Sequence, residues 1–187
     1  MKYKFIIIGV LIIGAVIFFM VSNDSSNVSP DSTNSNKSIV ISEGSSSIDS
    51  NNKIQFSYQD YQGNTVTHED FAGTPLVINS WASWCPFCID ELPDFAAIQK
   101  EFAGQVVFIA IDRSESLDTA QGYSDDLKVT DELIFLLDPD DSFYKTIGGF
   151  SMPETIFVDS KGIVTFQRRG QMQLDEIRDR TLELISS

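Results

Sequence analysis

The two cysteines of this 187-residue chain, Cys85 and Cys88, are separated by two residues in the stretch WCPFC. Thiols at this spacing can form a disulfide, contribute to a zinc or iron–sulfur site, or perform redox chemistry. As a structural cross-link the pair would stabilise the fold by only about 2 kcal/mol, because so short a loop restricts the unfolded chain weakly. Metal sites of these kinds need further ligands, and the chain holds no third cysteine and one histidine, His68. The composition therefore favours redox chemistry.

The segments around Cys85 predict a strand followed at once by a helix. Residues 75–82 form an apolar run with β-branched side chains, which is typical of a buried central strand. Residues 86–102 carry apolar side chains at helical spacing, and Pro86 occupies the first helical position, where its missing N–H costs nothing. Cys85 is then the N-cap, and its sulfur can accept hydrogen bonds from the amides of Phe87 and Cys88.

A thiolate at this N-cap is stabilised because the start of a helix carries a partial positive charge. The effect is about 0.3–1 kcal/mol for an exposed anion and up to ~2 kcal/mol for a partly buried one. Since one pKa unit is about 1.36 kcal/mol, the helix alone lowers the pKa of Cys85 by roughly one unit. Hydrogen bonds, including one from the Cys88 thiol, must lower it further. We expect an accessible thiolate at Cys85, with Cys88 behind it to resolve a mixed disulfide.

The rest of the chain from residue 53 predicts a layered α/β sandwich. Apolar and alternating runs indicate strands, the first of them an edge strand, at residues 53–59, 106–112, 133–138, 155–159 and 163–169. Helical patterns cover residues 115–128 and 174–185, and a short helix follows residue 138. Strands alternate with helices, and the chain closes with a β-hairpin and a last helix, an order that builds a sheet covered by helices.

The N-terminal end predicts export and anchoring. Lys2 and Lys4 precede the uncharged apolar run 5–21, which would rise about 25 Å as a helix. We therefore expect residues 1–21 to form an uncleaved signal-anchor or transmembrane helix, with a cleaved signal peptide as the alternative. Because the lysines precede the span, the rest of the chain should lie on the extracytoplasmic side of the cell membrane, in a single-pass topology.

Composition divides the remainder into a linker and one domain. Residues 22–52 contain twelve serines and six asparagines and predict a disordered linker, because they cannot bury enough apolar surface to fold. Residues 53–187 have a globular composition and suit a single domain. The net charge of −14 argues against nucleic acid as a partner, since phosphates require basic surfaces.

Two motifs carry a resemblance to a known family. The stretch WASWCPFC (81–88) resembles the active-site segment of thioredoxin-fold thiol–disulfide oxidoreductases of the membrane-anchored, extracytoplasmic TlpA/ResA type, and SMPETIF (151–157) resembles the loop that bears their cis-proline. The resemblance implies a thioredoxin-like three-layer α/β sandwich with a central mixed sheet and an N-terminal β-hairpin, over most of residues 53–187. It makes Cys85 the nucleophile, Cys88 the resolving cysteine and Pro153 the cis-proline.

Further residues are matched to roles by the same resemblance. The backbone of Met152 would bind an extended substrate segment, and Trp84, Pro86 and Phe87 would border the thiol and contact substrate. Glu91 matches an acidic residue that follows the motif in ResA-like proteins, and its helical spacing from Cys88 suits a proton relay. An ordinary solvated helix residue is the alternative for Glu91.

Three positions carry more ordinary expectations. Asn79 occupies the place where thioredoxin has a buried aspartate, and it cannot titrate, which strengthens the assignment of Glu91. Trp81 is expected in the core, and His68 on the surface.

The resemblance implies an enzyme that exchanges disulfides with exported proteins, such as apocytochrome c, in cytochrome c maturation or envelope redox homeostasis. Such an enzyme would need no cofactor beyond its redox-active Cys85–Cys88 disulfide. A membrane electron donor or acceptor would be a further partner. The direction of exchange is left open. One alternative is a copper carrier that binds Cu(I) through Cys85, Cys88 and Met152, and another is a thiol peroxidase.

Overall fold

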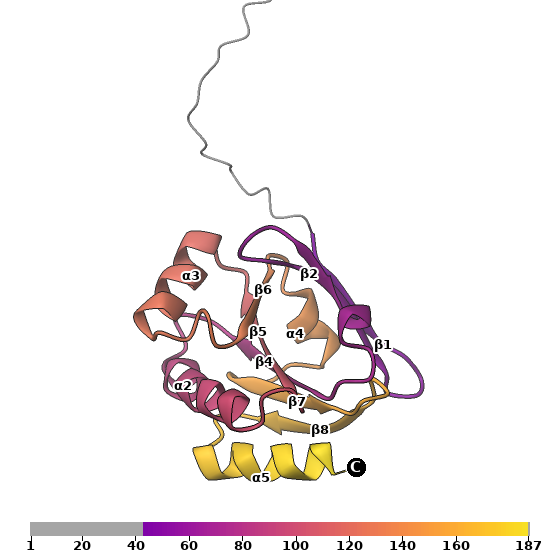
Figure 1. The fold of residues 1–187 in the computed structure, drawn as a ribbon. Coiled ribbons are helices and arrows are strands. Elements are labelled where there is room, and N and C mark those ends of the chain that lie inside the picture. Colours follow the sequence, from indigo (N-terminus) through magenta and orange to yellow (C-terminus); the bar gives the residue numbers. More distant parts are fainter. Residues whose placement is uncertain (1–42, 187) are drawn as a thin grey trace, which may run out of the picture. The chain divides into compact units, whose positions relative to one another are not determined.

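The computed structural model describes residues 43–186, which fold around one mixed β-sheet (Figure 1). The sheet order is β1-β2-β6-β5-β4-β7-β8, and β3 pairs with β2 beside this path. Its strands are β1 (Ser45–Ile48), β2 (Ile54–Asp60), β3 (Thr65–Thr67), β4 (Leu76–Trp81), β5 (Val107–Arg113), β6 (Ile134–Asp138), β7 (Glu154–Val158) and β8 (Val164–Arg169). The neighbours β4, β5 and β6 run parallel, and the other pairings are antiparallel. The predicted mixed sheet and its N-terminal hairpin, β2–β3, are confirmed.

Helices cover both faces of the sheet. They are the 3-10 helix η1 (His68–Phe71) and the α-helices α2 (Pro86–Glu101), α3 (Leu117–Asp126), α4 (Ser142–Thr146) and α5 (Leu174–Ile185). One hydrophobic cluster joins the sheet to α2, α3 and α5 through Phe95, Ala120 and Ile177. A second cluster on the other face holds Phe143 of α4 and, at its margin, Phe71 of η1. The three-layer α/β sandwich predicted from the sequence is confirmed.

The start of the domain differs from the sequence-based boundary. Residues Ser45–Ile48, which we expected within the linker 22–52, form strand β1 and pair antiparallel with β2, with Ser46 opposite Phe56. Serine-rich composition predicted disorder, but backbone pairing with β2 and the contact of Ile48 with the second hydrophobic cluster hold this segment. Because β1 takes the edge of the sheet, β2 is an inner strand and not the edge strand that its alternation indicated.

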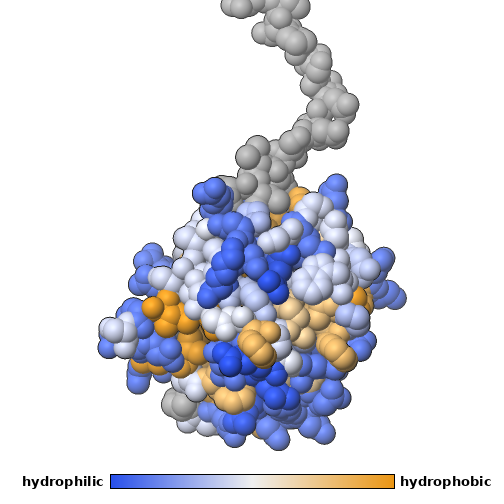
Figure 2. All heavy atoms as spheres, turned by 180° about the vertical axis from the view of Figure 1, so that it is seen from behind, coloured by the Kyte–Doolittle hydropathy of each residue, from blue (hydrophilic) through white to orange (hydrophobic). Residues whose placement is uncertain are grey.

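The predicted membrane anchor, residues 1–21, and most of the linker lie outside the described residues. Between residues 43 and 186, none of the helices has the length and apolar character needed to cross a membrane. Figure 2 shows one face of the domain, which is mostly hydrophilic with small separate hydrophobic patches.

Candidate active site

Cys85 and Cys88 form a disulfide at the start of α2. Cys85 is the N-cap in an extended backbone conformation, and Pro86 is the first helical residue, as the sequence predicts. Of the two amides expected to reach the Cys85 sulfur, that of Cys88 donates to Sγ at 3.2 Å. A negative charge on Cys85 in the reduced protein would therefore meet both the helix N-terminus and a directed N–H group.

The disulfide is covered by its own motif. Cys88 is fully buried and Cys85 is 3% exposed, so the accessible sulfur predicted from the sequence is nearly enclosed in this oxidised state. Both sulfur-bearing residues belong to the hydrophobic cluster beneath α2. The residues around them are open to solvent: Trp84 is 59% exposed, Phe87 is 58% exposed, and Pro86 is also exposed. A partner would meet these exposed side chains before it reaches Cys85.

The loop before β7 supplies the second predicted motif. The peptide bond between Met152 and Pro153 is cis, as the resemblance implies. Met152 is partly buried and packs against the same hydrophobic cluster that contains both cysteines. Pro153 is buried, whereas Phe150, which the sequence analysis did not single out, is 83% exposed. The loop Phe150–Pro153 thus carries an exposed aromatic ring three residues before the cis-proline.

Glu91 is buried beneath the motif and is not the solvated helix residue of the alternative prediction. Its Oε1 accepts a hydrogen bond from the backbone N–H of Met172 at 2.9 Å, and its buried Oε2 has no hydrogen-bond partner. Burial raises the pKa of Glu91 to about 8, against the lowering effect of the Met172 bond. A carboxyl group with this pKa can both donate and accept a proton near neutral pH.

Glu154 directly follows the cis-proline and was missed by the sequence analysis. Its buried carboxylate accepts hydrogen bonds from the amides of Phe150 at 2.8 Å and Ser151 at 3.4 Å. It also accepts from Gln167 at 2.7 Å and pairs with Arg169 at 3.0 Å, both from β8. Glu154 therefore ties the loop to the sheet. The signal in the sequence was a carboxylate at the head of an apolar strand, a position that demands several hydrogen-bond donors.

A second missed carboxylate fixes the other segment of the site. Glu115 accepts hydrogen bonds from the backbone N–H of Ser83 at 2.7 Å and from the Ser83 hydroxyl. Asp112, fully buried at the end of β5, accepts from the Glu115 amide at 3.1 Å. Burial, followed by a hydrogen bond and charge repulsion from Glu115, raises the pKa of Asp112 to about 9. Glu115, oriented by buried Asp112, holds the turn that leads into Trp84 and Cys85.

The remaining predicted residues have structural places. Trp81 is fully buried, as expected for a core residue. Asn79 is buried and donates to Thr155 Oγ1 at 2.9 Å, so it links β4 to β7. His68 is partly buried, and its Nδ1 accepts a hydrogen bond from the Phe56 amide at 3.4 Å. Within residues 43–186 no group of three or more His, Cys, Asp or Glu side chains is arranged to hold a metal ion.

Comparison with known proteins identifies the family of this chain. The Redoxin family model matches residues 49–182. The chain belongs to the Redoxin family. Thiol:disulfide interchange protein DsbE from Allochromatium vinosum is 35% identical over 108 residues, a match spanning 57% of this chain and 57% of that relative. Thiol-disulfide oxidoreductase ResA from Bacillus thuringiensis is 24% identical over 127 residues, 66% of this chain and 71% of the relative.

Solved structures of this redoxin's relatives show the same fold. The exposed lipoprotein thioredoxin Etrx1 from Streptococcus pneumoniae aligns with a TM-score of 0.63 and 27% identity, over 70% of this chain and 99% of that structure. The resemblance to TlpA/ResA-type thioredoxin-fold proteins, predicted from two short motifs, is therefore confirmed for the family and the fold.

Proposed function

We propose that this redoxin is a thiol–disulfide oxidoreductase that exchanges disulfides with exported proteins. The observation that carries the proposal is the disulfide itself: Cys85 caps α2 and accepts the Cys88 amide, and Met152, which precedes the cis-proline, packs against the hydrophobic cluster that holds both cysteines. The names of the relatives, thiol:disulfide interchange protein and thiol-disulfide oxidoreductase, describe the same chemistry. The apolar run 5–21 behind two lysines supports an extracytoplasmic location at the cell membrane.

The exchange proceeds through two displacements at sulfur. In the reductive direction, the Cys85 thiolate attacks a substrate disulfide, forms a mixed disulfide and releases one substrate thiolate. Cys88 then loses its proton and attacks Cys85 Sγ, so that the intramolecular disulfide forms and the second substrate thiolate leaves. Two electrons pass to the substrate. The oxidative direction is the reverse sequence, and in either case an external thiol or disulfide partner at the membrane must restore the starting state.

Glu91 handles the proton of Cys88 in this scheme. The two residues lie one helical turn apart on α2 and both are fully buried, so bulk water does not reach them directly. With its pKa raised to about 8, Glu91 can take up the proton when Cys88 attacks and return it when the disulfide opens. The Cys85–Cys88 disulfide is then the redox group, and no further cofactor is required.

The experiment that tests the function is a covalent trap. The full-length Cys88→Ser variant, produced in its native host, should accumulate mixed disulfides between Cys85 and its partners, because the resolving sulfur is missing. Partners released by reductant and identified by mass spectrometry would supply both the substrate and the direction, and apocytochrome c is the partner that the family suggests. The Cys85→Ser variant is the matched control and should trap nothing. Equal capture by both variants would overturn the proposal.

A further inference from the structure

Arg113, at the end of β5, lies between the two segments that border the disulfide. Its Nε and Nη2 atoms donate to the two carboxylate oxygens of Asp141 at 2.7 and 2.6 Å. The side chains of Arg113 and Asp141 are only 16% and 20% exposed. The Nε–Nη2 edge of the guanidinium is bound to Asp141, whose carboxylate offsets its charge and fixes its plane. Its faces, however, remain available for stacking.

Those faces meet aromatic rings from both sides of the site. The guanidinium carbon of Arg113 lies 3.5 Å from the ring centroid of Tyr144 and 5.9 Å from that of Trp84. Both distances fall within the range of about 6 Å for an attractive cation–π contact. Trp84 is the exposed residue that precedes Cys85. Among residues 43–186, Arg113 is the one cation found over its ring. Arg113 therefore contacts the segment that carries the nucleophilic sulfur.

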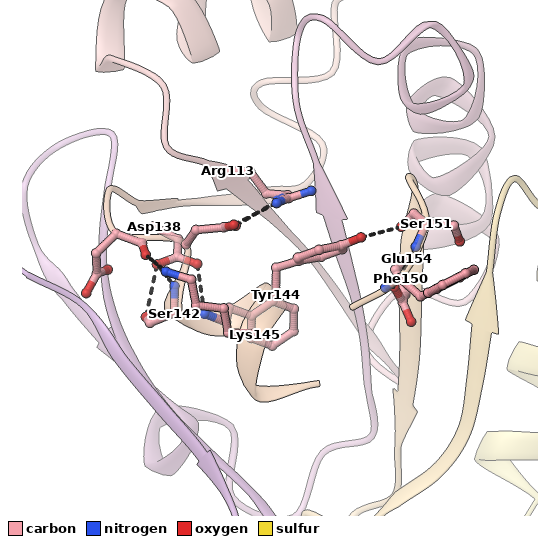
Figure 3. A network of polar contacts seen from close by, with 11 residues as sticks. Arg113, Asp138, Ser142, Tyr144, Lys145, Phe150, Ser151 and Glu154 are labelled. Carbon is pink, nitrogen blue, oxygen red and sulfur yellow. Dashed lines mark hydrogen bonds and ion pairs between the residues drawn. The ribbon is translucent and has the colours of Figure 1, made fainter. Parts of the chain in front are cut away.

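Tyr144 extends the connection to the cis-proline loop. Figure 3 shows its side chain reaching from α4 to Ser151, and its hydroxyl donates to the Ser151 carbonyl at 3.2 Å. The chain makes room for this ring at Gly149, where a Cβ would lie 2.4 Å from the nearest ring atom. On the other side of the loop, Glu154 accepts the amide of Ser151. The backbone around Ser151 is thus held at both its carbonyl and its N–H.

We propose that Arg113 is a positioning residue, which couples the Trp84–Cys85 segment to the Phe150–Pro153 loop so that a polypeptide substrate meets both at a fixed separation. The proposal rests on the proposed function and adds to it the residue that sets the separation of these two segments. Lysine would not replace arginine here, because an ammonium group lacks both the two-pronged bond to Asp141 and a flat face for two rings.

The test compares a peptide with a small molecule as targets of the same sulfur. In the Cys88→Ser background, reduced Cys85 attacks the cysteine sulfur of a probe whose cysteine is bonded to thionitrobenzoate, which leaves as a coloured thiolate. One probe is a ten-residue peptide with a central cysteine between apolar residues, and the other is N-acetylcysteine amide. The ratio of the two second-order rate constants isolates the contribution of the peptide chain. This ratio does not depend on whether the physiological reaction reduces or oxidises the substrate.

Arg113→Gln should lower this ratio about tenfold. Arg180→Gln is the matched control. Arg180 on α5 also pairs with a carboxylate, Glu183, and its guanidinium carbon lies 4.1 Å from the ring centroid of Phe166 on β8. The Arg180→Gln variant should show the same ratio of rate constants as the Cys88→Ser parent. Tyr144→Phe, which removes only the hydroxyl bonded to Ser151, should lower the ratio by itself, and it carries the test if Arg113→Gln fails to fold.

The double variant decides whether the two residues act as one unit. If Arg113 works through Tyr144, combining Arg113→Gln with Tyr144→Phe should lower the ratio no more than about twofold beyond Arg113→Gln alone. The inference would be overturned if the effects of the two substitutions on the ratio multiplied in the double variant. It would also be overturned if Arg113→Gln left the ratio unchanged, or if the ratio in the Cys88→Ser parent were near one. Failure of the proposed function looks different, because Cys85 would then react slowly with the small probe as well.

Discussion

The carboxyl group of Glu91 on α2 accepts a hydrogen bond from the backbone N–H of Met172, which lies 2.9 Å away in the loop before α5. Both residues are fully buried. This bond joins the helix that carries both cysteines to the C-terminal helix, and it leaves one carboxylate oxygen without a hydrogen-bond partner. A fully ionised carboxylate is poorly accommodated in such a place, which is why burial dominates the shift of its pKa.

The first prediction concerns the pH dependence of stability. With its pKa raised to about 8, folded Glu91 keeps its proton up to that pH, whereas the unfolded group ionises near its ordinary pKa of 4.5. Between these values the unfolded chain releases a proton that the folded protein retains, so the free energy of unfolding falls as pH rises. Glu91→Gln lacks this contribution, and its stability relative to wild type should rise by up to about 4 kcal/mol from pH 5 to pH 8.

Urea unfolding at several pH values measures this difference. Asp90→Asn, at an exposed neighbouring position of α2, is the control and should show a flat difference across the same range. A flat difference for Glu91→Gln would mean that Glu91 is ionised in the folded protein.

The second prediction concerns the thiolate. In the reduced protein, the pKa of Cys85 should lie below about 7.5, because the Cys88 amide and the start of α2 both stabilise the anion. Thiolate absorbance near 240 nm, followed across pH, reports the ionisation. The same protein in concentrated urea should titrate near the ordinary value of about 8.5. Coincident curves for folded and unfolded protein would contradict the nucleophile assignment.

The third prediction concerns the loop support. Glu154→Ala removes the acceptor of two loop amides and one acceptor each of Gln167 and Arg169, so it should lower the free energy of unfolding by about 1–3 kcal/mol. Glu183→Ala removes a carboxylate that is 66% exposed in its pair with Arg180, and it should cost less than about 1 kcal/mol. Denaturant unfolding compares the two variants. Similar small losses would show that Glu154 does not hold the loop.

The fourth prediction uses two glycines with opposite surroundings. A Cβ at Gly149 would lie 2.4 Å from the Tyr144 ring, so Gly149→Ala should destabilise the fold by about 1–3 kcal/mol. A Cβ at Gly122, inside α3, would meet nothing within 4 Å, so Gly122→Ala should stabilise it by about 0.5–1 kcal/mol through helix propensity. Thermal unfolding distinguishes the two signs. A stabilised Gly149→Ala would place the Tyr144 ring elsewhere.

Local sequence signals predicted much of this molecule. The apolar run 75–82 and the proline after Cys85 indicated β4, the N-cap and the start of α2, because each depends only on neighbouring residues. Glu91 was assigned through the resemblance to ResA-like proteins, and its helical spacing from Cys88 supported the assignment. The complete burial of Glu91 was not predicted, because its hydrogen-bond donor, the backbone N–H of Met172, comes from a distant part of the sequence.

Contacts between distant segments account for what the sequence analysis missed. Arg113 and Tyr144 meet only after β5 and α4 have folded, and neither forms part of a recognisable motif. Ser83 finds Glu115 in the same way. Strand β1 was missed because serine-rich composition describes side chains, whereas its pairing with β2 is made by the backbone.

The complete burial of Cys88 has a consequence for the order of events. An incoming sulfur can approach only Cys85, since Cys88 has no solvent-accessible surface. Steric access alone is then enough to select which half of the bond is attacked. Whatever the chemistry of the attacking molecule, adducts formed by opening this disulfide should be found at Cys85.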